Sequence, residues 1–390
     1  MDEKKMRVAI THGDINGVGY EMILKAFEDS TLLELCTPII YGSSKIANYY
    51  IKVYGLENLK FNIINQANQA KAGNVNLLEC CGEEDIPVTP GVPTVESGRA
   101  AMQAIQRAID DYKDGAFDVL VTAPVNRSTM ENFNGHSDYL ERRLELGKKG
   151  LSILMNEDFR VAMVTNNLAI KDISESITKQ KIVEKGLLFS ETLRRDLRIS
   201  SPRIAVLSLN PRCGEDGALG DEEQEIIIPA IKEMEEKGIQ AFGPYAADNF
   251  FGQGDYYRFD GVLAMYHDQG MTPFKTLSPE EGVRFTGGLP IIRTAPAIAA
   301  ISGTMEHHTP EKDAIRSQAN ANSLRQAIYV AIDVLRNRTN YDEPLANPLP
   351  KLYHERRDDS EKVRFRSSNN EGGKENSVPA AQKNNKENKN

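Results

Sequence analysis

The densest group of side chains capable of chemistry lies in residues 265–296, directly after an apolar segment. Its sequence, MYHDQGMTPFKTLSPEEGVRFTGGLPIIRTAP, mixes imidazole, carboxylate, ammonium and guanidinium groups with glycines. An imidazole can bind a metal or move a proton, while lysine and arginine can hold a phosphate or a carboxylate. Packing alone does not require so many polar groups after a buried strand. We therefore predict a functional site in this segment, with four candidate side chains: His267, Lys275, Arg284 and Arg293.

A second candidate is the stretch TAPVNRSTMENFNGHSDYLERRL at residues 122–144. His136 and Ser137 follow Gly135, just ahead of a helix that we expect to begin near Asp138. The free amide groups of a helix start, with a hydroxyl and an imidazole beside them, suit an anion such as phosphate. A capping serine next to a surface histidine would explain the same pattern without a ligand. The residues alone leave both interpretations open.

Two further loops follow apolar segments and are less specific. In THGDINGVGYE (11–21), glycines allow a tight turn and close approach to a ligand, but the spacing matches neither common nucleotide-binding motif. In SLNPRCGEDGALGDEE (208–223), Arg212 could hold a carboxylate or a phosphate. It could equally be an ordinary solvated charge among acidic neighbours.

Alternating strands and helices must position these loops. Short apolar segments rich in Val and Ile predict strands at 7–12, 38–42, 117–124, 160–165, 203–210 and 260–266. Amphipathic patterns predict helices at 95–115, 178–197 and 324–338. This alternation indicates a mostly parallel α/β sheet covered on both faces. Ligands of such sheets bind at the carboxyl ends of the strands, where the candidate loops lie.

Length and composition limit the function classes. A chain of 390 residues is too long for one core, so two domains are expected. The net charge of -9 speaks against a nucleic-acid partner, and no apolar run approaches the roughly 20 residues of a membrane span. The N-terminus lacks the features of a signal peptide, which favours a cytoplasmic protein. The four cysteines show no CxxC spacing and indicate neither a disulfide framework nor a zinc knuckle.

The C-terminal segment has a different composition. It includes the stretch SSNNEGGKENSVPAAQKNNKENKN, which contains almost no large apolar residue. Such a sequence cannot bury enough surface to offset the entropy of ordering. We predict a disordered tail at residues 355–390.

Several motifs, taken in this order, resemble the 4-hydroxythreonine-4-phosphate dehydrogenase family (PdxA). The likeness covers roughly residues 6–350. Its best-matched pieces are Gly-Asp-x-x-Gly-x-Gly (13–19), TAPVN (122–126), GHSDYL (135–140), LSLNP (207–211), YHDQG (266–270) and GLPIIRT (288–294). The resemblance implies an α/β fold of the isocitrate/isopropylmalate-dehydrogenase type. It has two α/β/α domains, expected here at 1–125 plus 296–345 and at 126–295. A homodimer completes each active site with residues from both subunits.

The resemblance also implies a reaction. The family oxidises a phosphorylated hydroxy-amino acid with NAD or NADP, and the keto product then decarboxylates in pyridoxal phosphate (pyridoxine) biosynthesis. A divalent metal (Zn, Mg or Co) held by histidines acts as a Lewis acid. Carried over by position, Lys275 is a substrate contact and the candidate proton carrier in catalysis. The other substrate-binding positions are His136, Ser137, Arg284 and Arg293, of which Arg284 replaces an asparagine of the family.

Only part of the family's metal site is present. His267 matches one metal ligand, while Asn167 and Arg212 replace the other two histidines. The family pattern Thr-x-x-Asp-His-Gly-Thr is replaced by TAPAIAAIS (294–302), which affects cofactor and closure contacts. Two alternatives to the dehydrogenase therefore remain open. One is a degenerate paralogue that binds a phosphate ligand or regulates, without metal-dependent turnover, and the other is an enzyme with metal-independent chemistry.

Overall fold

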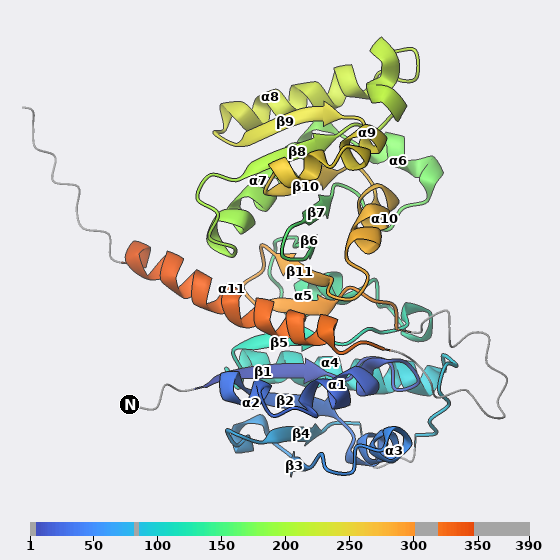
Figure 1. Ribbon diagram of the computed structural model, residues 1–390, viewed down its shortest axis with the longest axis vertical. Coiled ribbons are helices and arrows are strands. Elements are labelled where there is room, and N and C mark those ends of the chain that lie inside the picture. Colours follow the sequence, from blue (N-terminus) through green and yellow to red (C-terminus); the bar gives the residue numbers. More distant parts are fainter. Residues whose placement is uncertain (1–4, 82–85, 301–318, 347–390) are drawn as a thin grey trace, which may run out of the picture. The chain divides into compact units, whose positions relative to one another are not determined.

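Strands from distant parts of the chain join in one sheet in the computed structural model (Figure 1). The structure describes residues 5–81, 86–300 and 319–346. Within these ranges the twelve strands lie in the order β3 (Phe61–Ile64), β4 (Val75–Glu79), β2 (Cys36–Gly42), β1 (Met6–Thr11), β5 (Val119–Thr122), β12 (Arg293–Pro296), β11 (Val283–Gly287), β6 (Leu151–Met155), β7 (Arg160–Met163), β10 (Gly261–Ala264), β8 (Arg203–Leu207) and β9 (Gln240–Tyr245). The predicted tail at 355–390 lies outside the described residues.

The sheet confirms the predicted α/β class and the six expected strands. Most neighbouring strands are parallel. The central part differs, because β11 runs antiparallel to both β12 and β6, and β6 runs antiparallel to β7. The sequence analysis did not predict β3, β4, β6, β9, β11 or β12. One sheet runs through both predicted domains, and their division at 1–125 plus 296–345 and 126–295 stays a prediction.

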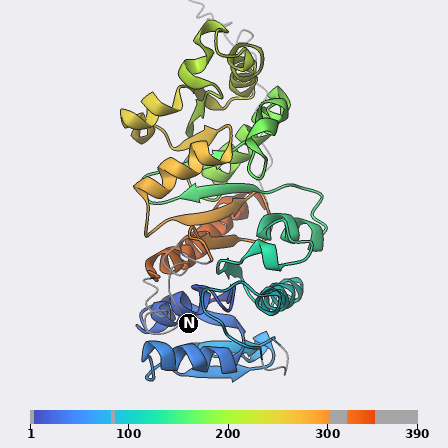
Figure 2. The same ribbon diagram turned by 90° about the vertical axis from the view of Figure 1, so that its right-hand side faces the viewer.

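Helices lie on both sides of this sheet (Figures 1 and 2). They are α1 (Gly19–Phe27), α2 (Leu32–Leu35), α3 (Ser44–Tyr54), α4 (Val95–Lys113), α5 (His136–Arg143), α6 (Ile173–Ser176), α7 (Lys179–Arg195), α8 (Ile228–Glu236), α9 (Ala247–Gly252), α10 (His267–Leu277) and α11 (Asn322–Ala346). The three predicted helices correspond to α4, α7 and α11. Thr94 and Thr178 fix the starts of α4 and α7, because each side chain accepts a hydrogen bond from a first-turn amide.

The strands are buried on both faces, as their continuous apolar sequences predict. In β1, Val8 and Ile10 pack on the side of α1 and α11, while Ala9 packs on the side of α4. In β8, Ile204 packs on the side of α7 and α8, and Ala205 on the side of α9 and α10. Successive residues of a strand point to opposite faces, so each strand joins two cores. This places loops, rather than strand faces, at the ligand-binding edge.

A buried ion pair joins α11 to the residue after α7. The Arg338 guanidinium donates to both carboxylate oxygens of Asp196 at 2.7 and 2.9 Å, and both side chains are almost fully buried. A second group of hydrogen bonds runs from Arg338 to the carbonyls of Leu289 and Pro290. Since removing one partner of such a pair leaves an unpaired buried charge, this contact stabilises the packing of α11 against the sheet.

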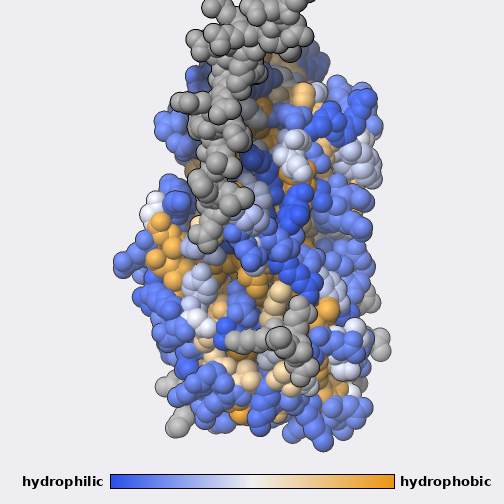
Figure 3. Space-filling model, turned by 90° about the vertical axis from the view of Figure 1, so that its left-hand side faces the viewer, coloured by the Kyte–Doolittle hydropathy of each residue, from blue (hydrophilic) through white to orange (hydrophobic). Residues whose placement is uncertain are grey.

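The polarity of the surface and the state of the cysteines match what the composition predicts. All four cysteines are free thiols. On the face shown in Figure 3, the coloured residues are mostly hydrophilic, with smaller hydrophobic areas between them. No helix in the described ranges is long and apolar enough to cross a membrane.

Candidate active site

A cavity of about 830 Å³ gathers most of the predicted site residues. Its walls come from the segments that follow β5, β7 and β12, and from α5, α10 and β11. The predicted residues that line it are His136, Ser137, Asn167, His267, Lys275, Arg284 and Arg293. Of the residues singled out from the sequence as ligands, Arg212 does not line this cavity. Segments that are more than a hundred residues apart in the chain therefore meet at one site.

Two arginines on neighbouring strands dominate the charge of the cavity. Arg293 begins β12 and is only 3% exposed. Its Nε donates to the Thr122 hydroxyl at 2.9 Å, and its Nη1 to the Thr286 hydroxyl at 3.4 Å. Arg284 lies on β11. Among the described residues, neither guanidinium forms an ion pair with a carboxylate. Arg293 is held by neutral hydroxyl groups instead.

The pKa values of both arginines reflect this burial. Burial, followed by the charge of Arg284, lowers the pKa of Arg293 to about 9. Burial, followed by the charge of Arg127, lowers the pKa of Arg284. Each shift means that burial destabilises the charged form of the side chain. An anion bound between them would relieve both the desolvation and the mutual repulsion.

The start of α5 adds an imidazole and a hydroxyl. Gly135 precedes it with φ of 126°, a conformation that favours glycine, and α5 begins at His136, two residues before Asp138. The Ser137 hydroxyl lies 3.1 Å from the Thr286 hydroxyl. The Nε2 atom of His136 is buried and has no partner among the described residues. Burial, then Arg293 and Arg284, lower the pKa of His136 well below its usual value, so the ring is neutral.

The residues His267, Asp268 and Gln269 have separate roles at the start of α10. The Nδ1 of His267 lies 2.7 Å from an Asp268 carboxylate oxygen. The Gln269 amide accepts a hydrogen bond from the Met265 backbone and donates one to the Ser208 carbonyl, both at 2.7 Å. Gln269 therefore ties the ends of β10 and β8 together. Lys275 lies in the last turn of α10, exposed at the cavity wall.

Arg212 lies elsewhere, in a turn at Pro211–Asp216. Arg212, Cys213 and Glu215 all have φ near +50°, in the left-handed region that costs about 1–2 kcal/mol per residue. The Nε of Arg212 pairs with a Glu215 oxygen at 2.7 Å, and the arginine side chain is 63% exposed. Within the described residues, Arg212 is therefore not assembled with His267 and Asn167.

The donor set does not fit the metal that the family resemblance implies. Zinc sites use three or four imidazole, thiolate or carboxylate ligands. Asn167 offers only an amide oxygen, and the guanidinium of Arg212 is a cation with no lone pair to give. Across the described ranges there is no group of three His, Cys, Asp or Glu side chains able to hold a metal ion. We therefore derive no chemical step through a metal.

The sequence analysis missed several polar residues of the cavity. They include Asn126, Arg127, Lys149, Ser152 and Lys185. Arg127 directly follows the TAPVN motif, so its position was a usable signal. Lys149 and Lys185 come from a loop and a helix with no motif. Only the folded chain brings them to the site.

An α/β sheet with a cationic cavity at the carboxyl ends of its strands is typical of proteins that bind a phosphorylated or acidic small molecule. Residues 34–331 match the family described as pyridoxal phosphate biosynthetic protein PdxA. The chain belongs to this family, which confirms the resemblance drawn from its motifs.

Individual proteins similar to this chain bear the name of the same family. A 4-hydroxythreonine-4-phosphate dehydrogenase of Bacteroides thetaiotaomicron is 52% identical over 369 residues, covering 94% of this chain and 98% of the relative. One from a Sulfurihydrogenibium species is 33% identical, covering 85% and 99%. The solved structure of the Klebsiella pneumoniae 4-hydroxythreonine-4-phosphate dehydrogenase has a TM-score of 0.69 at 26% identity, covering 86% of this chain and 99% of that one. The expected fold of the isocitrate/isopropylmalate-dehydrogenase type is confirmed.

Proposed function

We propose that the protein is a dehydrogenase that oxidises 4-hydroxythreonine 4-phosphate, or a closely related phosphorylated hydroxy acid, in pyridoxal phosphate biosynthesis. One observation carries this proposal: Arg293 is buried and Arg284 half-buried at the cavity, and neither has a carboxylate ion partner among the described residues. A phosphate dianion supplies the missing charge and can accept several hydrogen bonds at once. The name of the relative that is 52% identical points to the same kind of substrate.

The cavity residues suggest a division of roles. Arg293 and Arg284 hold the phosphate, while the Ser137 hydroxyl and the neutral ring of His136 offer uncharged hydrogen bonds beside it. Lys275, on α10 at the cavity wall, is the proposed carrier of the proton that leaves the oxidised hydroxyl.

Dehydrogenases of this family use a nicotinamide cofactor, and we propose NAD or NADP here. When bound, the cofactor accepts the hydride. The residues that would border it are the glycine-rich loop 13–19 and residues 295–300. These two segments contact each other, since the Val18 amide donates to the Ala300 carbonyl at 2.9 Å. A side chain at Gly17 would collide with that carbonyl, which explains the glycine.

The remaining proposals follow from the family resemblance. We propose a cytoplasmic homodimer that shares its active sites and has two α/β/α domains, with no nucleic-acid or membrane partner. We also propose that the isolated protein holds no stoichiometric divalent metal, because two of three ligand positions are Asn167 and Arg212.

The test is NAD(P)H formation by the purified protein on 4-hydroxythreonine 4-phosphate. The assay is run with NAD and with NADP, each in chelator and with added Zn²⁺, Mg²⁺ or Mn²⁺. Formation of NADH or NADPH supports the dehydrogenase, and the metal series shows whether turnover depends on a cation. Tight binding of the phosphate ester without any reduced cofactor would overturn it in favour of a phosphate-binding paralogue.

A further inference from the structure

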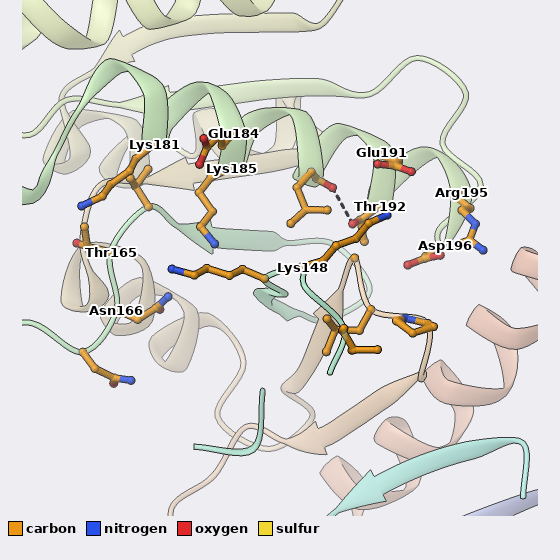
Figure 4. Close-up of a pocket in the computed structure, with 18 of the residues that line it drawn as sticks. Lys148, Thr165, Asn166, Lys181, Glu184, Lys185, Glu191, Thr192, Arg195 and Asp196 are labelled. Carbon is orange, nitrogen blue, oxygen red and sulfur yellow. Dashed lines mark hydrogen bonds between the residues drawn. The ribbon is translucent and has the colours of Figure 1, made fainter. Parts of the chain in front are cut away.

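A second cavity of about 990 Å³ lies along α7, beside the candidate active site (Figure 4). Lys148 and Lys181 line it together with Glu184 and Glu191. Charges of both signs in one cavity do not select a single class of ligand. The wall of the candidate active site is more informative, because a buried side chain outside the cavity holds part of that wall in place.

That side chain is Asn16, in the glycine-rich loop 13–19. Asn16 is fully buried, and it is not among the described residues that line the candidate active site. The loop around it is anchored, since the Asp14 amide donates to the Pro124 carbonyl at 2.9 Å. An Asp14 carboxylate oxygen in turn accepts the Asn16 amide at 2.9 Å. Asn16 therefore has a fixed position from which it can hold another segment.

The segment that it holds is the turn at residues 89–92. The Oδ1 of Asn16 accepts the Thr89 amide at 2.8 Å, and its Nδ2 donates to the Val92 carbonyl at 2.9 Å. The backbone carbonyl of Asn16 accepts the Gly91 amide at 2.7 Å. Within the turn, the Val92 amide donates to the Thr89 carbonyl at 3.1 Å. The turn is thus folded around Asn16.

The turn buries little of its own surface. Thr89 and Val92 are exposed, and Gly91 has φ of 80°, a left-handed conformation that favours glycine. A segment that buries little apolar surface opens easily unless hydrogen bonds fix it. We therefore expect the hydrogen bonds to Asn16 to set the position of this turn.

The turn forms part of the wall of the candidate active site, through Gly91 and the adjacent Pro93. The same glycine-rich loop holds another part of the wall. Two residues after Asn16, the Val18 amide donates to the carbonyl of Ala300, which also lines the cavity. One loop therefore sets two segments of the wall, one through Asn16 and the other through Val18.

We infer that Asn16 is a positioning residue, which holds the turn at 89–92 as part of the wall against which the nicotinamide cofactor binds. This inference rests on the proposed function, where the cofactor borders residues 295–300. The phosphate end of the cavity is held differently, because Arg293 donates to the hydroxyls of Thr122 and Thr286. Loss of Asn16 should therefore weaken cofactor binding and spare binding of the phosphate ester.

The experiment is calorimetric titration of full-length wild type and Asn16→Ala with NAD, with NADP and with 4-hydroxythreonine 4-phosphate. For the cofactor that the wild type binds, the dissociation constant should rise about tenfold in the variant, while that of the phosphate ester should stay within about twofold.

The matched control is Asn76→Ala. Asn76 is also fully buried, donates to the Pro38 carbonyl at 3.0 Å and accepts the Lys71 amide at 2.9 Å, but it is not among the described residues of the cavity wall. Both variants should unfold at lower urea concentration than the wild type, because each loses buried hydrogen bonds. Only Asn16→Ala should lose affinity for the cofactor.

Hydrogen exchange separates this inference from the proposed function, because it needs no ligand. The Thr89 amide should exchange about tenfold faster in Asn16→Ala than in the wild type or Asn76→Ala. Asn16→Asp keeps an acceptor for Thr89 and loses the amide donor to Val92, so its changes should be smaller and in the same direction. It provides the test if Asn16→Ala does not fold.

The outcomes are distinguishable. A wild type that binds neither cofactor would make the proposed function wrong, while faster Thr89 exchange in the variant would still support the role of Asn16 in holding the turn. Unchanged Thr89 exchange would overturn the inference. So would equal losses of cofactor affinity in Asn16→Ala and Asn76→Ala, since these would reflect lower stability alone.

Discussion

The phosphate side and the metal side of the candidate active site are built in opposite ways. Arg293 is buried and Arg284 half-buried on paired strands that border one cavity. Of the metal positions, His267 and Asn167 share the cavity wall, while Arg212 is exposed in a separate turn. Buried charges are costly unless a ligand compensates them, whereas exposed ones cost little. We therefore propose that this protein retains phosphate binding but not the three-histidine metal site, because Asn167 and Arg212 stand at two of its positions.

The largest expected effect is a gain in zinc affinity when histidines are placed at the two substituted metal positions. Asn167→His together with Arg212→His replaces a weak ligand and a cation with two imidazoles. We expect zinc affinity to rise by on the order of a thousandfold. Because Arg212 lies outside the cavity of its own chain, the gain should require the homodimer that we propose. Elemental analysis after incubation with Zn²⁺ measures it.

The matched control for this prediction is Asn167→His alone, which keeps the guanidinium. It should bind zinc little better than the wild type. One equivalent of tightly held zinc in the wild-type protein would contradict our account of the metal side.

The next effect concerns stability. Arg293→Met removes an unpaired buried charge and keeps a long side chain, so we expect the ligand-free protein to gain about 1–3 kcal/mol in free energy of unfolding. Substrate binding should be lost at the same time. Urea denaturation measures the first effect. Arg258→Met is the control, since Arg258 is exposed and its change should stay within about 0.5 kcal/mol. A destabilised Arg293→Met would assign the arginine a structural role.

A smaller effect is expected at Arg284, which stands where the family has an asparagine. Arg284→Asn removes one of two guanidiniums while Arg293 still holds the phosphate. The dissociation constant for a phosphate ester should rise about tenfold. Calorimetry against Arg258→Asn gives the comparison. An unchanged constant would show that Arg284 does not touch the ligand.

The smallest effect is a pH dependence at His136. Its pKa in the folded protein is lower than in the unfolded chain, so protonation favours unfolding. The stability contributed by this neutral ring is present above the unfolded pKa of about 6.5 and is lost as the pH falls below it, by at most about 1.4 kcal/mol per pH unit. Urea denaturation of the wild type and of His136→Gln between pH 7.5 and 5 should diverge toward low pH. Parallel curves would contradict the neutral ring.

The sequence predicted six strands that are apolar on both faces, but it missed the largely apolar strand β6, LSILM, as well as strands with polar residues. Strand β8, RIAVL, is a continuous apolar segment, and its burial follows from that pattern. Strand β12, RTAP, is short and polar, because its first residue faces the cavity. No periodicity could reveal it as a strand. Local function overrides strand propensity at this point of the chain.

The residues of the candidate site also form two groups, those that the sequence predicted and those that it did not. His136, Ser137, Lys275 and Arg293 could be named because each lies in a motif beside an expected strand end. Lys149 and Lys185 carry no local signal, since the fold alone brings a loop and a helix face to the cavity. The separation of Arg212 from His267 could not be predicted from the sequence either. It depends on the left-handed backbone of the turn at Pro211–Asp216, which no residue pattern predicts.

The most direct measurement compares 4-hydroxythreonine 4-phosphate with unphosphorylated 4-hydroxythreonine by calorimetry, on the wild type and on the Lys275→Ala, Arg293→Ala double variant. Charge-assisted hydrogen bonds from the buried arginine should favour the phosphorylated compound by at least about a hundredfold in the wild type. The double variant should lose most of this preference, because Arg284 is then the remaining guanidinium of the pair. Equal binding of the phosphate ester by the wild type and the double variant would contradict the account.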